Sequence, residues 1–109
     1  MQEVDQITID SLNLKNLNFM KIDVEGMEME VLNGAKKSIK KFKPYLIIEF
    51  LKSDKNKIEE FLKLNDYDFF EHDINLYAAQ KGDDILKKVK DTAEYLENLY
   101  HPKKSQELN

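Results

Sequence analysis

Residues 18–51 decide the fold: they read Asn18-Phe-Met-Lys-Ile-Asp-Val-Glu-Gly-Met-Glu-Met-Glu-Val-Leu32, then Asn33-Gly-Ala-Lys-Lys-Ser-Ile-Lys-Lys-Phe-Lys43, then Pro44-Tyr-Leu-Ile-Ile-Glu-Phe-Leu51. Phe19 to Val24 is mostly apolar, the pattern of a strand buried on both faces. From Met27 to Phe42 apolar residues recur at helical spacing, with acids first and lysines last, as the helix dipole favours. Pro44 ends this helix, and Tyr45 to Leu51 is a second apolar strand. The stretch therefore predicts a right-handed βαβ unit in a parallel sheet.

The same stretch carries a resemblance to a known family. Lys21-Ile-Asp-Val-Glu-Gly-Met-Glu-Met-Glu-Val-Leu-Asn-Gly-Ala35, followed by Lys43-Pro-Tyr-Leu-Ile-Ile-Glu49, resembles the signature of the FkbM family of S-adenosylmethionine-dependent methyltransferases. Ile7-Thr-Ile-Asp-Ser-Leu12 resembles the segment that precedes the signature in that family. The resemblance runs from about Ile7 to about Lys81.

The resemblance implies an α/β fold, the C-terminal half of a Rossmann-like class I methyltransferase sheet. In that fold the strand order is 3-2-1-4-5-7-6, and this chain would hold strands 4 to 7, which are contiguous in space. We expect a βαβ unit, a helix and a β-hairpin. The resemblance does not explain the extra amphipathic helix that periodicity predicts near the C-terminus.

The rest of the chain is assigned from periodicity and turn signals. The expected elements are a half-exposed strand at 6–12, a helix at 55–64 capped by Ser53 or Asp54, a hairpin of 67–72 and 76–80, and a helix at 85–100. Gly34 lies inside the first predicted helix, and we expect a close approach of that helix to the sheet there. These elements give a partial methyltransferase α/β domain at 1–82, a C-terminal helix at 83–101 and a disordered tail at 102–109. Residues 1–5 are expected to be frayed.

Composition limits the function classes. The 109 residues form one domain at most, with 41% hydrophobic and 35% charged residues, which is typical of a soluble globular protein. A net charge of −4 with interspersed lysines argues against a nucleic-acid surface. Without cysteine there is no disulfide or thiolate metal site, and no apolar run is long enough to span a membrane. We expect a cytoplasmic protein with no metal, nucleic-acid or membrane partner.

Two acids are the candidate catalytic residues. Asp23 ends the first strand of the βαβ unit, and open α/β sheets bind ligands at the carboxyl ends of their strands. The resemblance implies that this end faces the transferred methyl group, so Asp23 would orient the cofactor or accept a proton from a hydroxyl. The alternative for Asp23 is a helix N-cap. Glu25 lies on the loop itself and is the second candidate, although favourable interaction with the helix dipole would also explain it.

Three further charges are candidates for binding the substrate: Glu28, Glu49 and Lys21. Glu28 lies in the first helical turn, where the dipole alone would explain an acid. Lys21 and Glu49 interrupt apolar strands that should be neighbours, and charges are rarely buried without a partner. An ion pair between Lys21 and Glu49 would satisfy both, unless Lys21 reaches past the edge of the sheet.

The resemblance implies S-adenosyl-L-methionine as cofactor and O-methylation of a hydroxyl on a sugar or secondary metabolite, so the partner would be a small-molecule or glycan acceptor. Gly26, Gly34 and Gly82 are isolated, and none forms the glycine-rich turn after a strand that a Rossmann-like cofactor site needs. No residue is therefore assigned to the cofactor, and we expect the chain alone to bind none. The alternative is a non-catalytic remnant that binds itself or another partner.

The strand at 19–24 has no strand 1 beside it, which would leave its hydrogen-bonding edge open. We expect either that residues 6–10 fold back along this edge or that two chains pair edge to edge as a homodimer.

Overall fold

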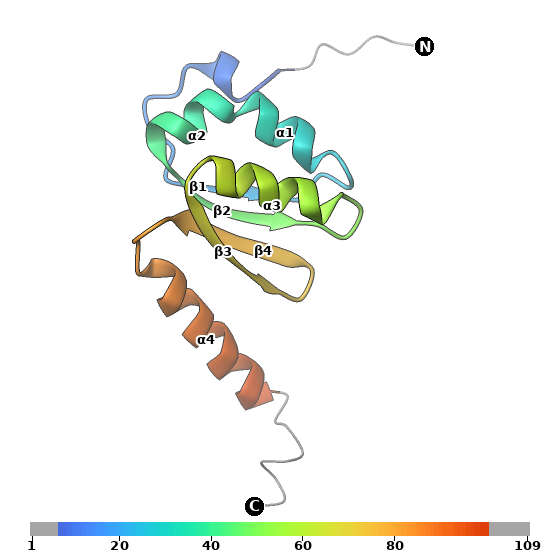
Figure 1. Cartoon of the computed structure of the whole chain (residues 1–109), viewed down its shortest axis with the longest axis vertical. Helices are drawn as coiled ribbons and strands as arrows, with labels where there is room; N and C mark the ends of the chain where they lie inside the picture. The colour runs from blue at the N-terminus through green and yellow to red at the C-terminus, as the bar shows by residue number, and fades with distance from the viewer. Residues whose placement is uncertain (1–6, 101–109) are drawn as a thin grey trace, which may run out of the picture.

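The computed structural model describes residues 7–100, which build one four-stranded sheet with helices on both faces (Figure 1). In chain order the elements are the 3-10 helix Asp10–Leu12, β1 Phe19–Ile22, α1 Glu28–Gly34, α2 Lys36–Phe42, β2 Tyr45–Glu49, α3 Lys55–Leu64, β3 Tyr67–His72, β4 Asn75–Gln80 and α4 Ile85–Tyr100. Helices α1, α2 and α3 lie together over one face, and α4 lies on the other side (Figure 1). Within residues 7–100, no helix combines the length and the apolar character needed to cross a membrane.

The sheet has the order β1-β2-β4-β3. Strands β1 and β2 are parallel, and β4 pairs antiparallel with both β2 and β3. The predicted βαβ unit and hairpin are therefore confirmed, as is the expected contiguity of the four strands. The helix predicted at 55–64 is α3, and Asp54 caps it by accepting a hydrogen bond from the backbone N–H of Lys57.

Most of the core lies on one face of the sheet. Side chains alternate across a strand, and the inward set of Ile22, Leu46 and Ile48 is buried against the helical layer. The opposite face carries Phe19, of which 52% is exposed, and Lys21, which is also exposed. The expectation that β1 is buried on both faces is therefore wrong, because α4 covers only part of the second face.

The predicted helix from Met27 to Phe42 is two helices. Ala35, with φ −113° and ψ 9°, separates α1 from α2. Gly34 ends α1, and a Cβ built on it would lie 3.1 Å from the Cβ and Cγ2 atoms of Thr8. The close approach expected at this glycine exists, but its partner is the N-terminal segment and not the sheet.

The N-terminal segment does not form the predicted strand. Residues 7–9 lack strand structure and run into the 3-10 helix, beside Gly34 and α2. β1 is consequently an edge strand, with no second strand partner among residues 7–100. The expected fold-back of residues 6–10 along β1 is wrong for residues 7–10, whereas edge-to-edge pairing of two chains stays a prediction. Gln6 lies outside the described residues, as do the predicted frayed end at 1–5 and the tail at 102–109.

Asp10 links this N-terminal segment to the start of α2. Its carboxylate accepts hydrogen bonds from the backbone N–H groups of Lys37 at 3.0 Å and Ser38 at 2.8 Å, and from the Ser38 hydroxyl at 2.7 Å. Burial alone would raise the pKa of Asp10, but these hydrogen bonds and the charge of Lys37 together lower it. Asp10 therefore acts as the N-cap of α2, although it lies far from α2 in the sequence.

Replacing this cap should weaken the fold measurably. Asp10→Ala is expected to lower the free energy of unfolding by about 1–2 kcal/mol, because the first N–H groups of α2 lose their acceptor. Asp10→Asn keeps an acceptor oxygen and should lose much less. Urea unfolding followed by circular dichroism compares the two variants with the native chain. Equal stability of Asp10→Ala and the native chain would show that the cap contributes nothing.

Candidate functional site

The loop between β1 and α1 forms a tight turn at the carboxyl end of β1. Glu25 has φ 53° and Gly26 has φ 100°, both in the left-handed region that favours glycine. A Cβ on Gly26 would lie 3.2 Å from the backbone oxygen of Lys52, in the loop that follows β2. The loops after two neighbouring parallel strands therefore touch, and Gly26 permits the contact.

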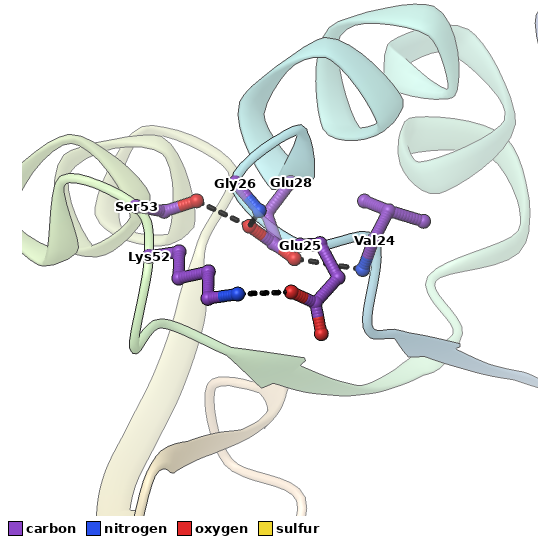
Figure 2. Close-up of polar contacts among 6 residues, drawn as sticks. All are labelled: Val24, Glu25, Gly26, Glu28, Lys52 and Ser53. Carbon is purple, nitrogen blue, oxygen red and sulfur yellow. Dashed lines mark hydrogen bonds and ion pairs between the residues drawn. The ribbon is translucent and has the colours of Figure 1, made fainter.

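Glu28 holds this turn from inside. Its side chain is 1% exposed, and its carboxylate accepts hydrogen bonds from the N–H of Val24 at 2.8 Å, the N–H of Gly26 at 3.0 Å and the hydroxyl of Ser53 (Figure 2). Burial alone would raise the pKa of Glu28, but the hydrogen bonds from Ser53 and the backbone outweigh it and lower the pKa. Glu28 thus satisfies backbone donors of one loop and ties it to the next.

A second link joins the two loops on the outside. Lys52 and Glu25 form an ion pair across them, and both side chains are mostly exposed (Figure 2). Exposed pairs contribute little to stability, so this pair orients Glu25 more than it holds the fold. Sequence reasoning missed Lys52 and treated Ser53 only as a possible helix cap, although both follow directly after a strand of the parallel unit.

Asp23 and Glu49 meet at the ends of β1 and β2. Ile22 pairs with Ile48 across the two parallel strands, so continuing the register by one residue places Asp23 level with Glu49. A side-chain hydrogen bond with Asp23, followed by burial and by the charges of Asp23, Glu25 and Glu28, raises the pKa of Glu49. Two acids that face each other in this way disfavour ionisation of Glu49, so Asp23 and Glu49 form a carboxyl pair at the ends of the two strands.

The predicted ion pair between Lys21 and Glu49 is wrong. Lys21 lies opposite Ile47 in the register, two residue pairs before Glu49, and its side chain is exposed. Among residues 7–100 no ion pair joins Lys21 to Glu49, and Asp23 is the neighbour of Glu49 instead. The alternative, that Lys21 reaches out from the edge of the sheet, fits its exposure.

The structure brings Asp23, Glu25 and Glu49 together at the carboxyl ends of β1 and β2, and it places Lys21 two residues before Asp23 on the same face of the sheet. Glu28 lies beneath the loop, and a substrate would have to displace Ser53 or the backbone donors to reach its carboxylate. The N-cap interpretation of Asp23 is wrong, because Met27 is the N-cap residue of α1 and makes no side-chain capping bond. Within residues 7–100 no three metal-binding side chains cluster.

A separate groove lies in the helical layer, away from the strand ends. It has a volume of about 540 Å³, and its lining includes Lys36, Lys40, Lys57, Met29, Phe61 and Leu64. The groove is larger than the hollow of about 170 Å³ that Phe19 of β1 helps to line, but a single carboxyl side chain, Glu60, is in its lining and no second acid accompanies it there. We therefore place the candidate site at the carboxyl pair, where strand ends, loops and acids converge.

Comparison with known proteins decides the family. The model of the methyltransferase FkbM domain matches residues 1–91. The chain belongs to the FkbM methyltransferase family. No curated protein and no solved structure matches the chain. Membership in a methyltransferase family implies a methyl donor, and in this FkbM domain the matched region holds all four strands and both loops that meet at the carboxyl pair.

Proposed function

We propose that this FkbM domain is the C-terminal part of an enzyme that transfers a methyl group from S-adenosylmethionine to a hydroxyl oxygen of a sugar or secondary metabolite. The observation that carries the proposal is the Asp23–Glu49 carboxyl pair at the ends of two adjacent parallel strands. In open α/β sheets, ligands bind beyond the carboxyl ends of the strands. The sheet order β1-β2-β4-β3 also corresponds to strands 4-5-7-6 of a Rossmann-like methyltransferase.

The carboxyl pair suits the proton transfer that O-methylation requires. A hydroxyl becomes a good nucleophile when a base accepts its proton, and a base works best when its pKa approaches the working pH. The raised pKa of Glu49 makes its ionised form a stronger base than an ordinary carboxylate. Asp23 and Glu49 accept the hydroxyl proton as a unit, and Lys52 keeps Glu25 beside them.

The side chains at the strand ends fit one end of the cofactor. Bound S-adenosylmethionine supplies the methyl group on a positively charged sulfonium. Asp23, Glu25 and Glu49 surround this edge with negative charge, and Lys52 is the nearby cation paired to it. The chain's three glycines are isolated in the sequence, so the backbone cradle of a Rossmann-like site has no counterpart in them.

The non-catalytic alternative has one observation in its favour. β1 is an edge strand whose outer side pairs with nothing among the residues that the structure describes, and such an edge can add a strand from another chain. Lys21 in the middle of this strand counts against self-pairing, because edge lysines are a common protection against it.

Binding of the demethylated cofactor tests the location of the site. We expect S-adenosylhomocysteine at millimolar concentration to shift the backbone amide resonances of residues 23–26 and 49–53 in the nitrogen-15 spectrum of this chain. Calorimetry should give a dissociation constant weaker than ~100 µM, because the glycine-rich cradle is missing. Adenosine at the same concentration controls for binding of the base and ribose alone.

Two outcomes would count against the proposal. Shifts confined to the helical layer around Lys36, Lys40 and Lys57, with none at residues 23–26, would put the site elsewhere. Binding of S-adenosylmethionine tighter than ~100 µM would show that this chain alone forms the cofactor site.

A further inference from the structure

The second half of α4 presents an apolar surface to solvent. Its first half packs beside the sheet, where Ile85 and Val89 border hollows lined by Tyr45 and Tyr77. Further along, four large apolar side chains occupy six positions and are exposed, by 66% in Tyr95, 46% in Leu96, 57% in Leu99 and 72% in Tyr100. We call these four residues the α4 stripe. Exposed apolar groups concentrated in this way mark interaction sites more often than scattered single ones do.

Acids flank the α4 stripe on both sides. Residues three or four apart are neighbours on a helix, so Asp91 lies beside Tyr95 on one flank and Glu97 beside Tyr100 on the other. Glu94 lies on the outer side, and all the lysines of α4 precede these acids, at positions 87, 88 and 90. Acids near a helix C-terminus oppose the helix dipole, so they do not stabilise α4 itself. Glu97 already lies 3.1 Å from Nε2 of His72 on β3, whereas a basic partner would explain the positions of Asp91 and Glu94.

The lysine groove described above has the complementary chemistry. Met29, Phe61 and Leu64 give it apolar walls, and 79% of Leu64 is exposed. Lys36 and Lys40 lie on the α2 side and Lys57 on the α3 side, so both rims are basic. None of the ion pairs among residues 7–100 includes these three lysines. One acid, Glu60, also lines the groove, so the lysines outnumber it.

The α4 stripe and the lysine groove of one chain cannot cover each other, and two stripes do not suit each other. The lysine groove lies in the helical layer and α4 lies on the opposite side of the sheet, so α4 cannot enter the groove of its own chain (Figure 1). Antiparallel pairing of two α4 stripes would bring the flanking acids Asp91 and Glu97 of one copy toward the same flanks of the other, and like charges across an interface are unfavourable.

We propose that the α4 stripe of one molecule docks into the lysine groove of a second copy of this chain. The stripe lies against Met29, Phe61 and Leu64, while Asp91 faces the lysines of one rim and Glu97, held by His72 of its own chain, lies on the flank toward the other. The mode is a helix in a groove, with apolar anchors and charged flanks. Because the two surfaces differ, the contact is head-to-tail and adds further copies instead of closing as a two-fold dimer.

The interface is small, so the association is weak. Two turns of helix bury less surface than the ~1,200–2,000 Å² of stable complexes, and we expect a dissociation constant of roughly 10 µM to 1 mM. Sedimentation velocity from micromolar to millimolar concentration should show an average mass that keeps rising beyond the dimer. Raising the salt to about 0.5 M should weaken the association, because exposed charges are then screened.

Two sets of substitutions remove the two surfaces separately. Lys36→Glu with Lys40→Glu reverses one rim of the groove, and Leu99→Lys with Tyr100→Lys replaces half of the stripe. Each double variant should weaken association at least tenfold. Lys41→Glu with Lys43→Glu is the matched control, since it makes the same charge change in or beside the same helix but outside the groove lining. This control should associate like the native chain.

Mixing the two double variants gives the decisive result. Each variant keeps one intact surface, so an equimolar mixture should form a one-to-one dimer although neither variant associates alone. Formation of this dimer also shows that both variants are folded. A native chain that stays monomeric at the highest concentration would overturn the proposal. Undiminished self-association of both variants would also overturn it and would point to pairing at the β1 edge. A mixture of the two variants that stays monomeric would overturn it as well.

Discussion

Glu28→Ala is expected to lower the free energy of unfolding by about 2–4 kcal/mol, the largest loss at a single polar side chain in this structure. The substitution removes a carboxylate that accepts from Val24, Gly26 and Ser53, and it leaves those donors without a partner beneath the loop. Hydrogen bonds to a charged group are worth more than neutral ones, and buried donors left unpaired cost the full desolvation penalty.

Thermal unfolding measures this effect, and Glu30→Ala is the matched control because Glu30 lies on the same helix but is exposed. The midpoint of Glu28→Ala should fall by at least ~10 °C, and that of Glu30→Ala should hardly move. If Glu28→Ala unfolds at the native temperature, the carboxylate does not hold the turn.

The pH dependence of this stabilisation follows from the lowered pKa of Glu28. A group with a lower pKa in the folded state stabilises the fold above its unfolded pKa and ceases to do so as the pH falls through its folded pKa. The gap in stability between the native chain and Glu28→Gln should therefore be full above about pH 4.5, the ordinary value, and should shrink below it. A gap that stays constant down to about pH 2 would contradict the assignment.

Asp23→Asn is expected to reduce methyl transfer by at least ~100-fold, because positioned acid–base groups contribute about 10²–10⁴ to a rate. The assay measures transfer of labelled methyl groups. The protein, in the form in which its natural source produces it, is incubated with methyl-labelled S-adenosylmethionine and with the carbohydrate and small-molecule fractions of the cells of that source. Asp68→Asn makes the same chemical change at an exposed position on β3 and serves as control.

Glu49→Gln should also reduce transfer, and it should change the pH profile. This variant lacks the carboxyl group whose pKa is raised, so the acid limb of the profile should move to lower pH. Native activity in both Asp23→Asn and Glu49→Gln would exclude the carboxyl pair from the chemistry.

Local patterns were sufficient to predict much of this fold. The helix at 55–64, the hairpin that follows it and the helix at 85–100 each have a clear period and clear stop signals, and all three form as expected. The proximity of Asp23 and Glu49 could also be predicted from the sequence, because the carboxyl ends of adjacent parallel strands lie at one edge of a sheet.

What local patterns missed depends on contacts between distant segments. Asp10 caps α2, which begins 26 positions later at Lys36, and no local sequence signal links the two. The helix break at Ala35 and the buried position of Glu28 both arise from how neighbouring segments pack. Lys21 was interpreted as a buried charge because the pattern of β1 does not reveal that one of its faces is largely uncovered. The strand register then favoured Asp23 over Lys21 as the neighbour of Glu49.

Titration of the Glu49 carboxyl carbon by carbon-13 NMR tests the carboxyl pair most directly, in the native chain and in Asp23→Asn. We predict that Glu49 titrates above its ordinary value of 4.5 in the native chain and returns toward that value when Asp23 becomes Asn, because the neighbouring acid raises its pKa. A Glu49 carboxyl that titrates at or below its ordinary value in both proteins would mean that Asp23 does not raise the pKa of Glu49, and the proposed site would lose its defining feature.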